Sequence, residues 1–279
     1  MKELFEQIKS LNILVLGDVM LDRYVIGRVS RISPEAPVPV IAVEKERSVA
    51  GGAANVSLNL SSLGASVETI GWFGRDESGE ELLQILSDQN IQVDSKFRFS
   101  SMPTISKTRV TASNQQICRV DREAHSSGYL PNLEKIGSSL IEKLKSADGV
   151  IVSDYGKGFV SNELLTLVRD HADFVSIDPK PSRLLEYSKP DLLTPNRLEA
   201  LEMAGLSRET MEPFPKEKVV DQIFNRFAPQ MLAITLGSEG MLLAVDGKIE
   251  TTIPTAAREV FDVSGAGDTV IASLTLALL

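Results

Sequence analysis

Cysteine and histidine are scarce in this sequence of 279 residues, which contains only Cys118, His125 and His171. A single cysteine excludes a disulfide within the chain and fits a reducing compartment. Two histidines argue against a zinc site and against a Ser-His catalytic triad. We therefore expect no metal cluster built from these two residue types.

Excess positive charge and long apolar runs are missing too. The formal net charge is −9, so the broad basic surface that binds nucleic acid is not expected. No apolar run approaches the roughly 18 residues of a membrane span, and residues 1–6 lack a signal core. We therefore expect a cytoplasmic protein that binds neither nucleic acid nor membrane. Small anions remain possible ligands through local cations, backbone amides and a metal ion.

Short apolar segments alternate with helical patterns along most of the chain, and 43% hydrophobic residues are ample for a core. Expected strands are 12–16, 67–73, 149–153, 174–178, 192–194 and 231–236, and expected helices are 51–64, 78–88, 132–145, 161–171, 197–203 and 216–227. A hairpin turning at Asp246-Gly247 follows the last of these strands. The alternation predicts an α/β fold with a doubly wound, mainly parallel sheet flanked by helices, whose ligands bind at the carboxyl ends of the strands.

Two insertions of extended chain interrupt this alternation. The first, at about residues 23–45, contains three prolines that exclude a helix. The second, at about residues 104–122, is a predicted hairpin. The expected strands are 23–29, 36–44, 104–111 and 116–122. Together they predict a small β-sheet lid on a single domain of residues 1–279.

The stretch Asp262-Val263-Ser264-Gly265-Ala266-Gly267-Asp268-Thr269 precedes an apolar helical segment. Backbone N–H groups at a helix start, together with the helix dipole, can hold an anion. An aspartate repels a phosphate there unless it accepts a proton. Gly265, Ala266 and Gly267 are therefore candidates for an anion hole, and Asp268 for a general base in phosphoryl transfer. Taken alone, a tight turn and a helix cap explain these residues equally well.

Further polar or glycine-rich segments follow the predicted strands. Each is an ordinary loop by itself, but together they converge on one edge of the sheet, where a ligand site is expected. They are Gly17-Asp18 with Asp22 in the same loop, 153–158 with Asp154, 178–180, 194–199 and 235–240. The sequence has no P-loop and no dinucleotide fingerprint after the first strand, which disfavours those two enzyme classes.

Three motifs, in the expected order, resemble those of the ribokinase-like (PfkB) carbohydrate kinases. They are Gly51-Gly52-Ala53-Ala54-Asn55, Asn196-Arg197-Leu198-Glu199 and the segment 262–268. The resemblance covers essentially the whole chain and implies the ribokinase-like fold, an ATP-dependent sugar kinase and Asp268 as its base. It also implies an ATP site that contains Asn196, Arg197, Leu198, Glu199, Lys180, Thr235, Gly237 and Gly240, with Glu199 acting on Mg²⁺ indirectly through the phosphates.

Segments 17–24, 28–40 and 107–110 resemble more narrowly the heptose 7-phosphate kinases within this family. This implies phosphorylation of D-glycero-β-D-manno-heptose 7-phosphate at C1, giving the 1,7-bisphosphate on the route to ADP-heptose for lipopolysaccharide. Lys107 and Arg109 share one face of a strand and are expected to pair with the substrate phosphate, although a solvated edge strand is the alternative. The expected sugar site contains Asp18, Asp22, Gly51, Gly52, Asn55, Lys107, Arg109 and Asp154.

Two other functions stay open: another sugar or sugar-phosphate kinase of the family, and a non-catalytic sugar or nucleotide sensor with this fold. Apolar residues at 38–43 predict either a homodimer through the lid or packing on the lid's own inner face. Related kinases usually continue beyond the helix that follows Asp268, so we expect the C-terminal end of the family fold to be missing. A C-terminal nucleotidyltransferase domain, to which such kinases are often fused, is a possible partner that this sequence does not contain.

Overall fold

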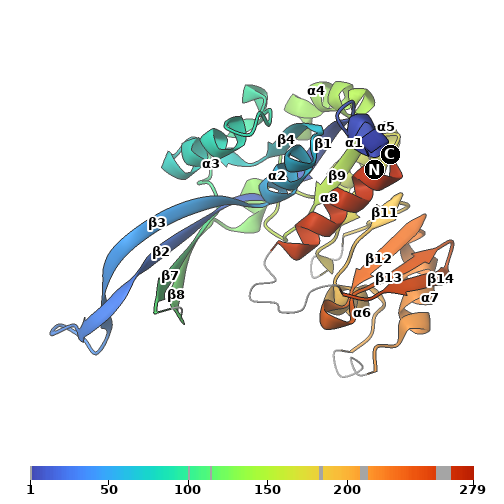
Figure 1. The fold of residues 1–279 in the computed structure, drawn as a ribbon. Helices are drawn as coiled ribbons and strands as arrows, with labels where there is room; N and C mark the ends of the chain where they lie inside the picture. The colour runs from blue at the N-terminus through green and yellow to red at the C-terminus, as the bar shows by residue number, and fades with distance from the viewer. Residues whose placement is uncertain (1, 100, 114, 182–184, 208–212, 256–264) are drawn as a thin grey trace.

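The computed structural model of the chain describes residues 2–99, 101–113, 115–181, 185–207, 213–255 and 265–279 (Figure 1). The central sheet contains β1 (Asn12–Gly17), β4 (Ser66–Gly71), β9 (Gly149–Ser153), β10 (Val175–Asp178), β11 (Leu192–Leu193), β12 (Met231–Thr235), β13 (Met241–Val245) and β14 (Lys248–Ile253). The helices are α1 (Lys2–Ile8), α2 (Ala53–Leu63), α3 (Glu77–Ser87), α4 (Leu133–Ser146), α5 (Asn162–His171), α6 (Arg197–Met203), α7 (Lys216–Phe227) and α8 (Ala266–Leu278).

The central sheet has the order β14-β13-β12-β11-β10-β9-β1-β4. All neighbours from β4 to β12 are parallel, and the predicted hairpin adds β13 and β14 as antiparallel strands at one edge. The expected doubly wound, mainly parallel sheet is therefore confirmed. Because parallel strands end on the same side, the loops after β1, β9, β10, β11 and β12 gather at one edge.

Helices cover both faces of this sheet because its central strands bury side chains in both directions. In β1, Ile13 and Val15 enter a core that α2, α3 and α8 also form. Leu14 and Leu16 enter the opposite core, which α4, α5 and α7 close. Strand residues alternate between faces, so a continuous apolar run builds both cores at once.

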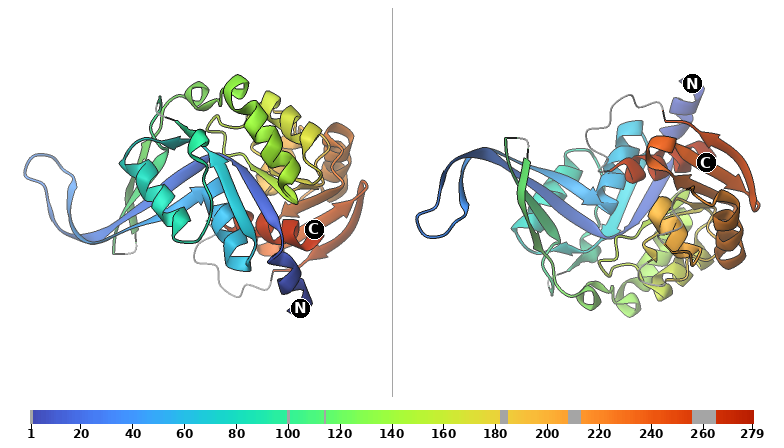
Figure 2. Two further views of the ribbon diagram at one scale, coloured as in Figure 1. Left: turned by 90° about the horizontal axis from the view of Figure 1, so that it is seen from above. Right: turned by 90° about the horizontal axis from the view of Figure 1, so that it is seen from below.

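A second sheet, which we call the lid sheet, extends away from the body (Figures 1 and 2). It contains β2 (Val19–Ile32), β3 (Pro39–Gly52), β7 (Ser106–Ala112) and β8 (Gln115–Arg122) in the order β3-β2-β7-β8. The expected small sheet from two insertions is confirmed. Its first two strands, however, are longer than predicted.

The inner ends of these long strands correct two sequence predictions. Strand β2 starts directly after Asp18, because Val19 to Leu21 are apolar and buried, so Asp22 lies in a strand and not in a loop. Strand β3 runs to Gly52, so the glycine pair ends a strand and α2 begins only at Ala53. Gly52 has φ 58° and marks the junction, since few other residues adopt this left-handed conformation.

A smaller correction concerns the expected strand 67–73. The chain leaves the central sheet after Gly71, and β5 (Phe73–Gly74) pairs with β6 (Arg98–Phe99) in a separate two-stranded sheet. The buried Trp72 lies between β4 and β5 and stacks on Phe99, with ring centroids 4.3 Å apart. Among the described residues, no helix has the length and apolarity of a membrane span.

Candidate active site

The aspartate predicted to be the base lies in the first turn of α8. Asp262, Val263 and Ser264 of the same motif lie outside the described residues. Gly265 precedes the helix with φ 81°, in the left-handed region that favours glycine. Asp268 is 3% exposed, so its carboxylate is almost entirely removed from water.

Two donors hold the carboxylate of Asp268. Asn55 Nδ2 in α2 donates to Oδ2 at 2.6 Å, and the Tyr155 hydroxyl donates to Oδ1 at 2.6 Å. A Cβ on Gly265 would lie 2.8 Å from Asn55 Nδ2, so the glycine leaves room for this contact. Burial raises the pKa of Asp268 and so does the charge of Asp22, whereas the two hydrogen bonds oppose that rise. The structure thus joins two predicted residues, Asn55 and Asp268, to one that had no assigned role.

The loop that carries Tyr155 is fixed by the buried carboxylate of Asp18. Asp18 Oδ2 accepts the backbone N–H groups of Tyr155 at 2.9 Å and Lys157 at 2.8 Å, and Oδ1 accepts that of Phe159 at 3.0 Å. Asp18 is 1% exposed. Both of its oxygens therefore bond to the chain itself, and its contact with a sugar stays a prediction.

Two more residues of the predicted sugar site support the same region. Asp154 is buried and accepts hydrogen bonds from the Gly156 amide and the Tyr187 hydroxyl, both at 2.7 Å. A Cβ on Gly51 would lie 2.3 Å from Asp22 Oδ2, and one on Gly52 would lie 2.2 Å from the carbonyl oxygen of Asp18. The glycine pair therefore allows β3 to approach both aspartates closely.

The predicted ATP residues gather at the start of α6. Asn196 and Glu199 form a capping box, in which each side chain accepts a hydrogen bond from the backbone N–H group of the other residue. Glu199 also accepts from Lys180 Nζ at 2.9 Å. Burial lowers the pKa of Lys180, but the hydrogen bond to Glu199 and the charges of Glu199 and Asp178 together outweigh burial and raise it. Asn196 pairs through its backbone with Thr235 at the end of β12.

The remaining predicted ATP residues surround this group. Arg197 forms an ion pair with Glu239, and its guanidinium lies 5.4 Å from the ring centroid of Phe214. Leu198 is 40% exposed. Gly237 and Gly240 flank a short 3₁₀ turn after β12 and have φ 64° and 91°. All of these residues lie at the sheet edge that the alternation predicted.

Acidic side chains connect the two halves of the site. Asp178 ends β10 in a partly buried position, and desolvation raises its pKa well above its usual value, with the charges of Glu199 and Asp268 adding to that rise. The charge of Lys180, which is paired with Glu199, opposes this rise, so the acids and this cation form one charged cluster at the sheet edge. No three His, Cys, Asp or Glu side chains in the described ranges are placed to hold a metal ion by themselves.

The lid sheet turns a charged face toward this cluster. In the β2–β7 ladder Asp22 lies opposite Lys107 and Tyr24 opposite Arg109, so the expectation that the two cations share a face is confirmed. Arg109 forms an ion pair with Asp22 and lies over the Tyr24 ring. The ammonium of Lys107 forms no hydrogen bond or ion pair within the described part of the chain. Burial lowers its pKa, and so does the nearby charge of Lys157, whereas the charges of Asp22 and Asp121 on the neighbouring strands oppose this fall.

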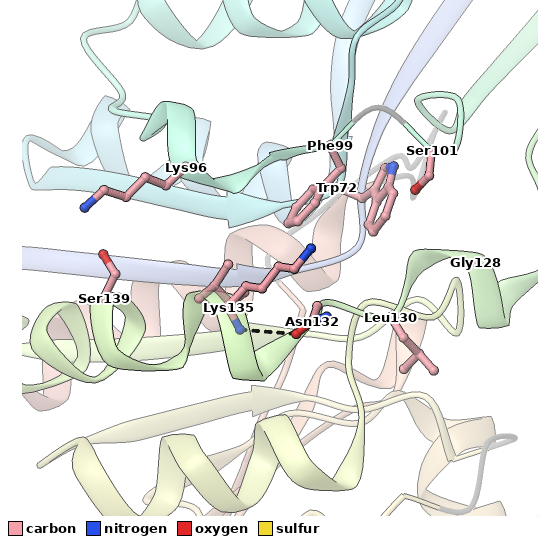
Figure 3. Close-up of a pocket in the computed structure, with 10 residues that line it drawn as sticks. Trp72, Lys96, Phe99, Ser101, Gly128, Leu130, Asn132, Lys135 and Ser139 are labelled. Atoms are coloured by element: carbon pink, nitrogen blue, oxygen red, sulfur yellow. Dashed lines mark hydrogen bonds between the residues drawn. The ribbon is translucent and has the colours of Figure 1, made fainter.

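A cavity of about 510 Å³ lies elsewhere, between the β5–β6 pair and the start of α4 (Figure 3). The stacked rings of Trp72 and Phe99 form one wall, and Lys135 extends beneath them. None of its lining residues belongs to the predicted site. The candidate active site is therefore defined by hydrogen bonds and charges at the carboxyl edge of the central sheet.

Comparison with known proteins agrees with this geometry. Residues 10–279 match the model of the pfkB family carbohydrate kinases. The chain belongs to this family. As a pfkB carbohydrate kinase it is a phosphotransferase, which confirms the enzyme class expected from its motifs.

Curated relatives of this pfkB chain carry the name bifunctional protein HldE. The protein from Pelobacter propionicus is 39% identical over 98% of this chain and 56% of its own length, and that from Helicobacter pylori strain G27 is 40% identical over 96% and 58%. The chain thus spans little more than half the length of these relatives. Among solved structures, Arabidopsis thaliana ribokinase complexed with ribose and ATP has a TM-score of 0.75 at 21% identity, over 96% of this chain and 86% of its own.

A second solved structure supports the same fold for the pfkB chain. Phosphofructokinase-2 from Escherichia coli in complex with fructose-6-phosphate has a TM-score of 0.72 at 21% identity, over 96% of this chain and 87% of its own. At this identity the likeness shows the fold alone. The ribokinase-like architecture expected from the sequence is thereby confirmed.

Sequence reasoning assigned no role to Tyr155, Lys157 or Asp178, although their segments stood among the candidate loops. The available signal was the run Ser153-Asp154-Tyr155-Gly156-Lys157-Gly158 directly after a buried strand. Nothing in that run shows that the phenol reaches a carboxylate on α8.

We predict that Asp18→Asn lowers the free energy of unfolding by about 2 kcal/mol or more, because an amide group would then face backbone donors that need an acceptor. Urea unfolding measures this change. Asp170→Asn is the control, since Asp170 is exposed on α5 and its loss is expected to change stability by less than about 0.5 kcal/mol. Equal stability of the two variants would contradict the anchoring role of Asp18.

Proposed function

We propose that the chain transfers the γ-phosphoryl group of ATP to the C1 hydroxyl of D-glycero-β-D-manno-heptose 7-phosphate. The product is the 1,7-bisphosphate, in the biosynthesis of ADP-heptose for the lipopolysaccharide core. The observation that carries the proposed chemistry is the buried carboxylate of Asp268 in the first turn of α8. The acceptor class rests on the heptose-kinase resemblance of the lid segments and on the charged face of the lid sheet.

Asp268 is proposed to be the general base. The acceptor hydroxyl loses its proton to this carboxylate, and its oxygen forms the bond to the γ-phosphorus while ADP leaves. The backbone amides of Gly265, Ala266 and Gly267 lie at the start of α8. They are proposed to offset negative charge on the transferring phosphoryl group. Lys180, held by Glu199, adds a cation on the nucleotide side.

Mg²⁺ is proposed to accompany ATP, with Glu199 acting on it through the phosphates. When bound, such an ion neutralises charge on the β- and γ-phosphates. The surroundings fit this cation, because Asp178 and Glu199 already repel each other in its absence. The protein's own part is to orient the nucleotide through Asn196, Lys180 and Thr235.

The phosphate of the acceptor is proposed to bind Lys107 and Arg109 on the lid sheet. Lys107 supports this assignment most directly, because it is a partly desolvated cation beside a second cation, Lys157, and forms no ion pair in the described residues, although the charges of Asp22 and Asp121 act favourably on it. Such a group is costly unless an anion joins it. Arg109 differs, since Asp22 already neutralises it. Arg109 is therefore expected to contribute through orientation as well as charge.

We predict that magnesium-dependent ADP release is fastest with heptose 7-phosphate in a panel that also contains ribose and fructose 6-phosphate. Asp268→Asn should retain the fold but lower kcat by at least roughly 10²-fold, the usual scale for loss of a general base. Circular dichroism and the ADP-release assay measure the two properties.

The same panel separates the alternatives. Preference for fructose 6-phosphate would favour the second candidate, another sugar-phosphate kinase of the family. Sugar binding without any ADP release, in a full-length protein, would favour a non-catalytic sensor. Near wild-type turnover by the Asp268→Asn variant would remove this residue from the base role.

We predict that Lys107→Ala and Arg109→Ala each raise KM for the phosphorylated sugar far more than KM for ATP. A steady-state matrix of both substrates measures this. Arg122→Ala is the matched control, because Arg122 lies on the same sheet opposite Ser106 and so faces the other side. Equal effects on both KM values, or an equal effect of the control, would count against phosphate recognition by the lid.

Two larger-scale proposals concern partners. A homodimer through the lid sheet would cover Val38 and Val43, which are each 51% exposed. We predict a dimer mass by light scattering for the wild type and a monomer mass for Val38→Glu/Val43→Glu, and a monomeric wild type would exclude this dimer. The bifunctional name and greater length of the relatives also support a second, nucleotidyltransferase domain in the full protein.

A further inference from the structure

Tyr155 is the one phenol that contacts the carboxylate of Asp268 in the described residues. Its hydroxyl donates to Oδ1 at 2.6 Å, while Asn55 donates to Oδ2. Burial raises the pKa of Tyr155, and the adjacent charge of Asp268 raises it further, so the phenol stays protonated. It therefore acts as a constant hydrogen-bond donor and not as an acid or a base.

The two donors are held with different rigidity. The backbone N–H group of Tyr155 donates a hydrogen bond to the carboxylate of Asp18, and so do those of Lys157 and Phe159. Gly158 packs so closely on the chain at Ser126 that a Cβ would lie 2.0 Å from the Ser126 carbonyl oxygen. Asn55 has no such restraint on its amide group, and it is itself a predicted sugar ligand. A sugar can thus replace Asn55 on Asp268, whereas Tyr155 keeps its place.

The charges around Asp268 explain why such a donor matters. Asp22 faces it from the lid sheet, Asp178 faces it from β10, and Glu199 lies beyond Asp178 on α6. Burial and the charge of Asp22 favour the protonated form of Asp268, and the charge of Asp268 in turn raises the pKa of Asp178. Among the described residues, the hydrogen bonds from Tyr155 and Asn55 favour the ionised form of Asp268, and so does the positive end of the α8 dipole.

We propose that Tyr155 is the positioning residue of the base: it occupies Oδ1 of Asp268, so that the proton of the sugar hydroxyl is transferred to Oδ2. This inference rests on the proposed function. In the step, the O–H bond of the acceptor breaks and its proton goes to Oδ2. The acceptor oxygen forms a bond to the γ-phosphorus, and the bond between that phosphorus and the β–γ bridging oxygen breaks with its electrons leaving on ADP.

The test is Tyr155→Phe, which removes the hydroxyl and keeps the ring. The Tyr155 hydrogen bond favours ionised Asp268, so its loss raises the pKa of that carboxyl and the base is protonated at higher pH. The acidic limb of the kcat profile should move to higher pH. With heptose 7-phosphate and ATP, kcat should fall roughly 10- to 100-fold, more at acidic than at alkaline pH, with both KM values little changed.

Two further variants keep the test decisive. Tyr129→Phe removes the hydroxyl of another buried tyrosine, which bonds to Pro103 and Ala124 outside the site, and should leave the acidic limb in place. Difluorotyrosine at position 155 retains the bond with a stronger donor and should move the limb to lower pH. An acidic limb that stays in place in both Tyr155 variants would overturn the proposal.

A measurement without substrate separates this inference from the proposed function. Carbon-13 NMR of aspartate carboxyls, with Asp268→Asn used for assignment, follows the titration of Asp268 directly. A higher pKa in Tyr155→Phe supports the contact even if heptose 7-phosphate proves not to be the acceptor. An unchanged titration overturns the inference even if Asp268→Asn abolishes ADP release.

Discussion

The structure depends on the buried carboxylate of Asp18 and on the hydrogen bonds that it accepts from three backbone N–H groups. A charge with 1% exposure is costly unless donors surround it, and here all the donors come from one loop. The loop can therefore take few other positions. The loop carries Tyr155 to Asp268 on α8 and Lys157 close to Lys107 on the lid sheet, so Asp18 aligns both halves of the candidate site.

Much of this architecture was predictable from local patterns. The apolar run at β1 and the alternation around it predicted a parallel sheet with its loops at one edge. The prolines near residue 37 and the hairpin after residue 104 predicted the lid sheet. The ends of strands were harder to predict. The apolar residues Val19 to Leu21 are compatible with either a loop or a buried strand, and the sequence alone does not distinguish the two.

Contacts between distant segments could not be predicted from the same patterns. The motif that ends at Asp268 predicted an acid beside an anion hole, and the Gly51-Gly52 motif predicted a sugar contact at Asn55. That these two side chains meet follows only from the packing of α2 on α8, and the phenol of Tyr155 arrives from a third segment. Hydrogen bonds between such distant residues depend on the tertiary fold, and the local spacing of apolar residues does not predict them.

The junction of β3 with α2 links the lid to the base. Gly51 and Gly52 end the lid strand against Asp22 and Asp18, and α2 starts at the next residue and carries Asn55 to Asp268. Gly52, with φ 58°, allows the chain to pass directly from the paired strand into the helix. The path from the lid strand to the side chain that contacts Asp268 is therefore only the first turn of α2. In the proposed function, this short path sets how far an acceptor phosphate at Lys107 lies from the carboxylate of Asp268.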